Sequence, residues 1–463
     1  MSQSTRAQKF FEDPRIQQAK QLIADATREH QKNIGQVQGP LSEQLAQNYE
    51  ESLQKLAQNR GGNLFYRYLG SGFGNGPFVE LADGSVKYDF ITGIGVHYFG
   101  HSHPELMGAI IDGAISNTAM QGHLQQNTDS HRLISLLLEQ ANINQGQFEH
   151  CFLSSSGVMA VENALKICFQ KNAPTHRVLA FERCFHGRTL GVSQITDKAA
   201  YRQGLPPTLT VDYLPFYDSS DHQGSIDRTC QQLQKYLKRY PCQYSCMIME
   251  VIQGEGGSYP GHEDFFKAII QILKENHISV IIDEVQSFGR TKNLYAFQYF
   301  KLDQLVDVVV IGKMSQVCAT LFKANHKPKP GLLSQTFTSS STAISASYHI
   351  LSTMIKENYL GEKGKIQKIH QYFSSKLKEL EKKMPDKITG PYGIGAMIAM
   401  TVYNGDMELS KKFSFDLFQN GVISFMAGAN PTRIRFLIPM GAIETKHIDD
   451  VVSIIERTLQ QTE

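Results

Sequence analysis

Short apolar runs that alternate with helical stretches constrain the fold of this chain more than any other feature. Apolar runs of this length, without polar alternation, are typical of strands that are buried on both faces of a sheet. The intervening helical stretches indicate crossovers between parallel strands, so we predict an α/β chain with a mainly parallel sheet flanked by helices. The runs are CFLSS (151–155), RVLAF (177–181), CMIMEVI (246–252), ISVIID (278–283) and VDVVVIG (306–312).

The sequence on either side of these runs has a different pattern. A Gln-rich, charged segment with a helical period begins the chain, and a Gly-rich segment follows it with a hairpin turn at ADGS (82–85). Long charged helices and short strands follow residue 345 and predict a smaller α+β lobe. With 463 residues the chain is long enough for two or three units. We expect a helical arm at 1–60, the first part of a small domain at 61–104, a large domain at 105–340 and the rest of the small domain at 341–463.

Charge and cysteine content limit the partners and the compartment. The net charge of +2 favours neither nucleic acid nor an anionic membrane surface as a partner. The seven cysteines have no CxxC spacing and their number is odd, so we interpret them as reduced thiols of a cytoplasmic protein. The first residues are polar and no apolar run reaches about 18 residues, so we expect no targeting segment and no membrane span.

Polar residues follow each of the apolar runs at the point where the predicted strand ends. In an open parallel sheet, ligands bind beyond the carboxyl ends of the strands. Because these ends meet at one edge of the sheet, we predict a functional site there. The polar residues are Ser155–Ser156–Gly157, ERCFHGRT (182–189), QGEGG (253–257), DEVQ (283–286) and Lys313.

The residue types at these ends suit pyridoxal 5'-phosphate (PLP). A Ser-Gly step that opens a helix offers a seat for a phosphate, and Lys313 offers an amine for the aldehyde. Asp283 would keep the pyridine nitrogen protonated, so that the ring can accept electrons from a carbanion. Lys313, once freed by a substrate amine, would move protons. The chain has no Trp, so Phe185 is the candidate for the ring that stacks on the cofactor.

Four motifs resemble those of the class III, or ornithine/4-aminobutyrate type, aminotransferases. They occur in the family's order, and the interval from Asp283 to Lys313 also fits. The resemblance implies PLP fold type I, PLP as the cofactor, and a homodimer with shared active sites. The motifs are YDFITGIGVHYFGHSHPEL (88–106), FHGRT (185–189), EVIQGEGG (250–257) and IIDEVQSFGRT (281–291).

The resemblance also implies roles for individual residues. Gln286 would reach the ring hydroxyl, and Thr336 would reach the phosphate bound by a neighbouring subunit. Arg188 and Arg435 are candidates for binding substrate carboxylates, which a guanidinium grips with two hydrogen bonds. Glu255 would pair with Arg435 and mask it from the wrong substrate. The phosphate itself would be bound by Ser156, Gly157 and Val158.

Within the family, GKMSQVC (312–318) and SSGVMAVENALK (155–166) are most similar to lysine ε-aminotransferase. We therefore expect an aminotransferase that moves an ω-amino group, such as that of L-lysine or ornithine, to a 2-oxoacid such as 2-oxoglutarate by a ping-pong mechanism. The chain departs from the common family pattern at Met159, where a glutamate is usual, and at TFTSSST (336–342), where TFGGNP is usual.

Other interpretations stay open at this point. The same fold carries decarboxylases, racemases and aminomutases, and a non-catalytic ligand-binding relative is a further alternative. His101, His103 and His186 come from separate motifs, so we expect loop hydrogen bonds rather than a metal site. Each proposed residue also has an ordinary explanation: Lys313 as a strand end in water, Ser156 and Asp283 as helix N-caps, Arg435 as an exposed strand residue, and Glu255 as a cap of loop N–H groups.

Overall fold

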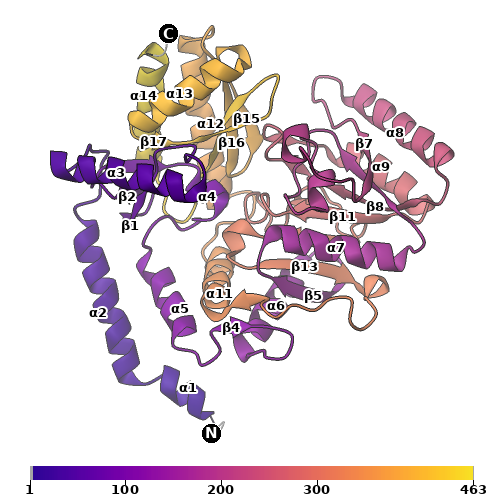
Figure 1. Ribbon diagram of the computed structural model, residues 1–463, viewed down its shortest axis with the longest axis horizontal. Helices are drawn as coiled ribbons and strands as arrows, with labels where there is room; N and C mark the ends of the chain where they lie inside the picture. Colours follow the sequence, from indigo (N-terminus) through magenta and orange to yellow (C-terminus); the bar gives the residue numbers. More distant parts are fainter. Residues whose placement is uncertain (1–3, 462–463) are drawn as a thin grey trace.

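The computed structural model describes residues 4–461, and a large, mainly parallel sheet forms its centre (Figure 1). Five strands, neighbours in the order β12, β11, β8, β6 and β7, pair in parallel. This pairing confirms the expected α/β architecture. The strand order is β5 (Phe148–Ser154), β13 (Cys318–Lys323), β12 (Val308–Ile311), β11 (Ser279–Glu284), β8 (Tyr244–Met249), β6 (Arg177–Phe181) and β7 (Thr210–Leu214).

Strand β13 runs against its neighbours β12 and β5. The connection from β12 to β13 spans only residues 312–317, which is too short for a parallel crossover, so the chain must turn back. The sequence predicted the end of β12 but not this reversed strand. The tight turn between the two strands contains Lys313.

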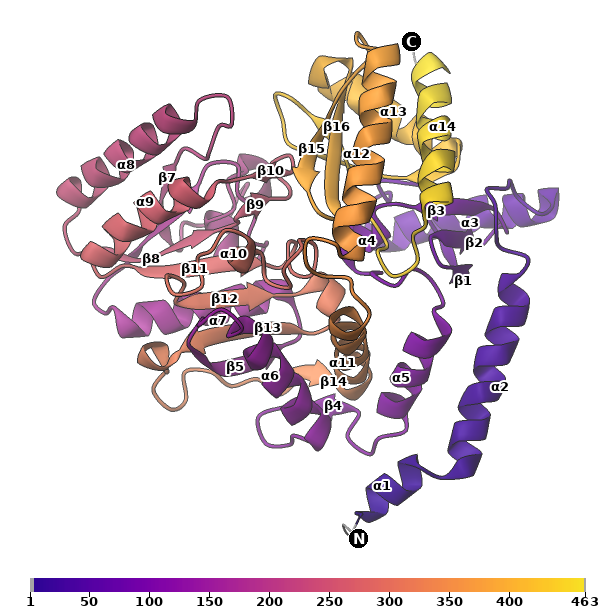
Figure 2. The same cartoon turned by 180° about the vertical axis from the view of Figure 1, so that it is seen from behind.

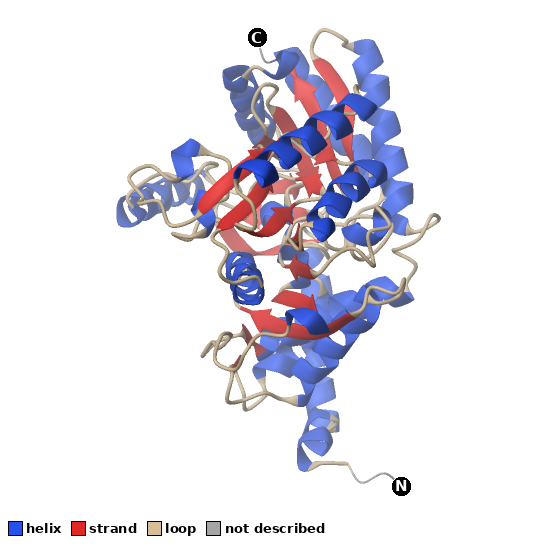
Figure 3. Cartoon of the chain, turned by 90° about the vertical axis from the view of Figure 1, so that its right-hand side faces the viewer, coloured by secondary structure: helices blue, strands red, loops and turns tan. Residues whose placement is uncertain are grey.

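Helices cover both faces of the sheet, as Figures 2 and 3 show. Alternate residues of one strand point to opposite faces, and here they belong to two separate cores. Ile281 packs in the core that contains the inner face of α7 (Gly157–Lys171), whereas Val280 and Ile282 pack in the core that contains α9 (Glu263–Glu275). Burial on both faces explains why the strands are apolar throughout. Further helices beside this sheet are α6 (Thr128–Ala141), α8 (His222–Arg239), α10 (Ala296–Tyr299) and α11 (Ser341–Lys356).

A second, antiparallel sheet follows in the C-terminal part of the chain. Its order is β15 (Ile388–Ile394), β16 (Met397–Val402), β19 (Arg433–Leu437) and β18 (Phe425–Ala427), with α12 (Lys365–Lys383), α13 (Met407–Gln419) and α14 (Thr445–Gln461) beside it. The early strands β1 (Gly70–Asn75), β2 (Phe78–Leu81) and β3 (Val86–Asp89) join this region, because β3 pairs with β17 (Val422–Ile423). Segments from both ends of the chain therefore lie side by side.

The N-terminal helices extend away from the main body (Figure 1). Helix α2 (Pro14–Gln31) lies along α5 (Pro104–Ala114), and Lys20 pairs with Asp112 at 2.7 Å. The pair is partly buried and joins the two helices. The remaining α-helices and strands are α1 (Arg6–Phe11), α3 (Glu43–Arg60), α4 (Thr92–Gly95), β4 (Met120–Gln121), β9 (Ile252–Gln253), β10 (Tyr259–Pro260) and β14 (Ser339–Ser340). Among residues 4–461, no helix combines the length and apolar character that crossing a lipid bilayer requires.

Candidate active site

Lys313 lies directly after β12 in a strained backbone conformation. Its φ of +57° is in the left-handed region, which costs a residue with a Cβ about 1–3 kcal/mol. The side chain is half-buried. Burial lowers the pKa of its amine, and the positive charge of Arg435 lowers it further, against the opposite effect of Asp283. A lowered pKa leaves more of the amine uncharged, as a nucleophile requires.

Asp283 lies on the neighbouring strand β11, and only 5% of it is exposed. One carboxylate oxygen is 2.7 Å from His186 Nδ1, and the other accepts a hydrogen bond from the Val285 N–H at 3.0 Å. Burial lowers the pKa of the His186 imidazole, but its neighbours, including Asp283, raise it by more, so it lies well above the ordinary value. Asp283 belongs to a strand and its turn, so the helix N-cap interpretation is wrong.

Glu250 belongs to the EVIQGEGG motif, but the sequence analysis assigned it no role of its own. It follows β8, next to β11, and accepts hydrogen bonds from the N–H groups of Phe185 at 3.0 Å and Gly254 at 3.1 Å. Burial raises the pKa of its carboxyl group to about 7. Glu250 thus joins the FHGRT loop to the QGEGG loop. Its position as the first polar residue after a buried strand was the available signal.

Arg435 joins the second sheet to the site. It lies on β19, is fully buried, and donates hydrogen bonds to Glu255 and, at 3.1 Å, to Gln286 Oε1. The interpretation of Arg435 as an exposed strand residue is therefore wrong. Because the charges of Arg435, Glu255, Glu250 and Asp283 all act on the Lys313 amine, the structure brings these residues together.

The N-terminus of α7 lies beside the DEVQ turn. Ser156 is the N-cap of this helix and accepts a hydrogen bond from the Met159 N–H at 3.4 Å. Gly157 approaches Val285 so closely that an added Cβ would lie 2.9 Å from Val285 Cγ1. Val158 packs against Gly187 of the FHGRT loop. The free N–H groups of the first helical turn therefore open toward the group around Lys313, which suits a phosphate.

Phe185 is half-buried, and its N–H joins it to Glu250 at 3.0 Å. Two other predicted residues lie further out. The exposed Arg188 places its guanidinium 3.7 Å from the centre of the Tyr201 ring. Thr336 is exposed on the loop before β14. Among the interactions within residues 4–461, none joins Arg188 or Thr336 to the group around Lys313, so their roles stay predictions.

The three histidines of the motifs have different partners. His101 Nε2 is 2.9 Å from Asp89, and His103 caps α5 by accepting a hydrogen bond from the Leu106 N–H. His186 pairs with Asp283, and its buried Nε2 has no hydrogen-bond partner within the described residues.

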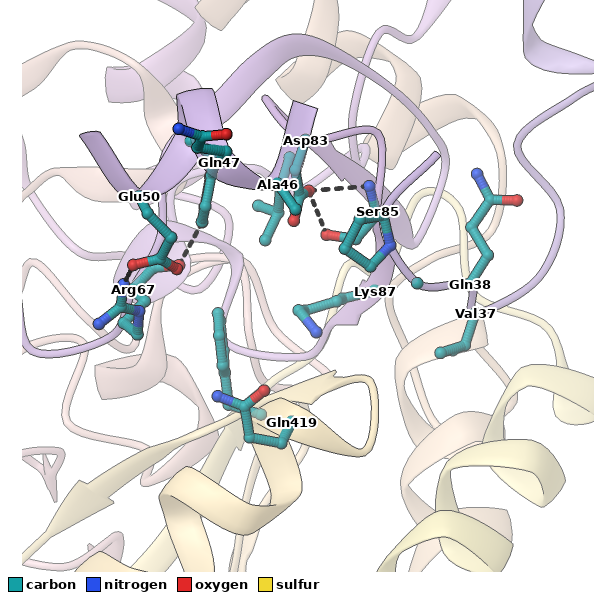
Figure 4. Close-up of a pocket in the computed structure, with 15 residues that line it drawn as sticks. Val37, Gln38, Ala46, Gln47, Glu50, Arg67, Asp83, Ser85, Lys87 and Gln419 are labelled. Carbon is teal, nitrogen blue, oxygen red and sulfur yellow. Dashed lines mark hydrogen bonds and ion pairs between the residues drawn. The ribbon is translucent and has the colours of Figure 1, made fainter. Parts of the chain in front are cut away.

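A pocket of about 580 Å³ lies apart from this group (Figure 4). The segment after α2, helix α3, the β2–β3 hairpin and the end of α13 form it, and Lys87 extends into it. Asp83 accepts hydrogen bonds there from the N–H and the hydroxyl of Ser85. Of the described residues that line this pocket, none belongs to the predicted site.

The donor set fits PLP: an amine of lowered pKa, a buried carboxylate on the next strand and an open helix N-terminus. The fold and this set define a PLP-dependent enzyme of fold type I. The family described as "Aminotransferase class-III" matches residues 71–459, and the chain belongs to this family of transferases.

Relatives of known name agree with this assignment, and solved structures share the fold. An acetylornithine aminotransferase of Listeria innocua is 28% identical over 396 residues, which cover 84% of this chain and 94% of that protein. The mitochondrial acetylornithine aminotransferase of Saccharomyces cerevisiae is 26% identical over 401 residues, covering 83% and 90%. Lysine aminotransferase from M. tuberculosis has a TM-score of 0.77 at 21% identity, covering 89% of this chain and all of that one. Ornithine aminotransferase from Toxoplasma gondii has the same TM-score at 20% identity, covering 89% and 95%.

Proposed function

We propose that this aminotransferase moves the terminal amino group of a basic amino acid, or of its N-acetylated form, to 2-oxoglutarate. The names of the relatives point to this donor class: acetylornithine, lysine and ornithine aminotransferases. The observation that carries the proposal is the pairing of Glu255 with the fully buried Arg435 close to Lys313.

The two substrates place their carboxylates differently. In an ω-amino donor the reacting amine is far from the carboxylate, whereas 2-oxoglutarate has a carboxylate beside the reacting carbon. A bare guanidinium near that carbon would favour the second substrate and disfavour the first. Glu255 masks Arg435 while the donor reacts, and it leaves when the oxoacid arrives. Glu255 lies between glycines, and Gly257 has a φ of +128°, a backbone conformation that glycine adopts without steric cost.

Within the site, Lys313 would hold the cofactor and would carry protons to and from the substrate carbon. Asp283, which His186 contacts, would pair with the pyridine nitrogen. When bound, PLP supplies an electron sink for the negative charge that develops on that carbon. Phe185 would pack on the ring, Gln286 would contact the ring hydroxyl, and Arg188 would bind the distal carboxylate. Ser156, Gly157 and Val158 would hold the phosphate.

We place this enzyme in the cytoplasm as a homodimer with shared active sites. The cysteines, all free, support a reducing compartment. Thr336 is exposed, as a residue that reaches a partner's phosphate must be in the isolated chain.

A donor panel tests the proposed substrate class. The donors are L-lysine, L-ornithine, N-acetyl-L-ornithine, L-alanine and a simple amine, each with 2-oxoglutarate or pyruvate. We expect glutamate to form fastest with 2-oxoglutarate and one of the first three donors. If only L-alanine or the simple amine served as a donor, the proposed donor class would be wrong. If a reaction product formed in the absence of any 2-oxoacid, the enzyme would be a decarboxylase, racemase or aminomutase instead.

A further inference from the structure

A second cavity, of about 670 Å³, lies between the two sheets. One wall is formed by residues that follow β7, including Phe216, and the opposite wall by Tyr392 of β15 and Arg433 of β19. Gln253 and Ser258, from the loop that carries Glu255, form the floor between them. Figure 2 shows β10 and β15 side by side at this place. The lining residues do not include Lys313, Asp283, Glu255 or Arg435.

Arg433 is a cation without a counter-ion in this cavity. Only 6% of the residue is exposed, and among the described residues no carboxylate lies within ion-pair distance of its guanidinium. One terminal nitrogen donates a hydrogen bond to the Gly257 carbonyl at 2.7 Å, and Nε has no partner within residues 4–461. A buried charge of this kind is costly unless it is paired. Burial accordingly lowers the pKa of Arg433.

Two aromatic rings hold the guanidinium in place. Its central carbon is 3.6 Å from the centre of the Tyr392 ring and 4.0 Å from that of Tyr259. Stacking compensates part of the desolvation cost and orients the group. It satisfies no N–H group, so a purely structural role leaves donors of Arg433 unmatched. A guanidinium that is fixed by stacking and still has free donors is prepared to bind an anion.

We propose that this cavity is a second binding site, for a small anion with a carboxylate or phosphate group seated on Arg433. Arg183 adds a second positive charge to the lining, whereas Glu182 and Asp218 add two negative ones. Asp218 is occupied by hydrogen bonds from the N–H and hydroxyl of Ser220. These carboxylates disfavour large polyanions, so the ligand is small and carries few charges.

Occupation of this site acts on the loop of residues 253–258. Arg433 and Arg435 are two residues apart on β19, so both side chains point to the same face of the strand. Arg433 binds the Gly257 carbonyl and Arg435 binds the Glu255 side chain. An anion bound to the free donors of Arg433 draws the guanidinium away from the Gly257 carbonyl and thereby shifts the loop that carries Glu255. This second consequence rests on the role proposed above for Glu255.

The binding test uses the absence of tryptophan in this chain. Phe216→Trp introduces one fluorophore in the wall of the cavity, and the holoenzyme carrying it is titrated with malonate and, separately, with inorganic phosphate. We expect a saturable change in emission with at least one anion. A response to malonate alone identifies a carboxylate site, and a response to phosphate identifies a site for that group. Sodium chloride at the same ionic strength is the control. If it changes the emission as much as malonate and phosphate do, the proposal is overturned.

Two further substitutions in the Phe216→Trp protein assign the site. Arg433→Gln should raise the Kd at least tenfold, whereas Arg239→Gln, which changes an exposed arginine at the end of α8, should leave it unchanged. An equal Kd in the Arg433→Gln protein would show that the anion binds elsewhere and would overturn the proposal. Because the readout needs no turnover, it stands whether or not the proposed substrates are correct.

A single-turnover measurement tests the effect on the loop. The ratio of the rate constants for L-glutamate and for the best ω-amino donor is measured with and without saturating anion. We expect the ratio to change at least threefold in the wild type and to stay constant in Arg433→Gln. An unchanged ratio despite proven binding would refute the coupling to Glu255 and leave the anion site intact.

Discussion

At the scale of single residues, the proposed function depends on the pairing of Glu255 with Arg435. Removing the mask exposes the guanidinium to the carboxylate of ordinary α-amino acids. We therefore expect Glu255→Ala to increase the rate constant for L-glutamate relative to that for an ω-amino donor by about tenfold, which corresponds to about 1.4 kcal/mol. Stopped-flow single turnovers of both half-reactions measure this ratio. Glu275→Ala, at an exposed position on α9, is the control. If Glu255→Ala and Glu275→Ala have the same ratio of rate constants, Glu255 does not mask Arg435.

Glu250 makes a contribution to the free energy of unfolding that falls as the pH rises, whereas the contribution of most carboxyl groups rises with pH. Its pKa is about 7 in the folded chain and 4.5 as the ordinary value. The folded state therefore holds this proton more tightly than the unfolded state, so its contribution is most favourable below the ordinary pKa and is lost as the pH rises to about 7. Between about pH 5 and pH 8 the loss amounts to about 2–3 kcal/mol.

Glu250→Gln removes this dependence. We expect the free energy of unfolding of the wild type to fall by about 2–3 kcal/mol more than that of the variant between these pH values. Urea unfolding of both proteins at each pH provides the measurement. Parallel pH profiles would show that Glu250 is ionised throughout. The comparison uses the difference between pH values, because the amide also disturbs the hydrogen bonds from Phe185 and Gly254 at every pH.

At the scale of elements, the turn between β12 and β13 stores strain at the reactive lysine. Lys313 has a φ of +57°, a conformation that glycine adopts without steric cost. The free energy of unfolding of Lys313→Gly should therefore be about 1 kcal/mol higher than that of Lys313→Ala. At most positions the alanine variant is the more stable of the two. Thermal or urea unfolding measures the stability of the two variants. Neither variant has the lysine ammonium, so the difference between them reports on the backbone. If alanine were the more stable substitution, the backbone here would be unstrained.

The elements also show how far the sequence alone leads. The apolar runs predicted β5, β6, β8, β11 and β12, because burial on both faces leaves a clear pattern. They did not predict the reversed strand β13, whose direction depends on the length of the preceding turn.

The same limit applies to the site. Asp283 and Lys313 were predicted because polar residues after buried strands are conspicuous. Glu250 accepts hydrogen bonds from two loops, and Arg435 is fully buried. Both features depend on how distant segments pack, which a local sequence pattern does not determine.

At the scale of the whole molecule, exposed apolar side chains near β4 and β14 accord with the proposed dimer. Leu124 is 96% exposed, Phe337 57% and Met120 41%, and β4 pairs with β14 beside Thr336. Phe337→Asp should shift the native mass toward the monomer and raise the Kd for PLP at least tenfold, because the shared sites separate. Light scattering and cofactor titration measure both effects. Ile143→Asp, at an exposed position away from this pair of strands, is the control. A monomeric wild type, or a dimer in which Phe337→Asp has no effect on either quantity, would contradict this arrangement.

The central claim is that Lys313 holds PLP in a class III aminotransferase. Its most direct test is reduction of the holoenzyme with borohydride, followed by mass spectrometry of the peptides. We expect the reduced cofactor on the peptide that contains Lys313, and we expect Lys313→Ala to retain none of it covalently although the variant folds. Reduced cofactor on another lysine in the wild type, or an equal amount retained by Lys313→Ala, would contradict the account.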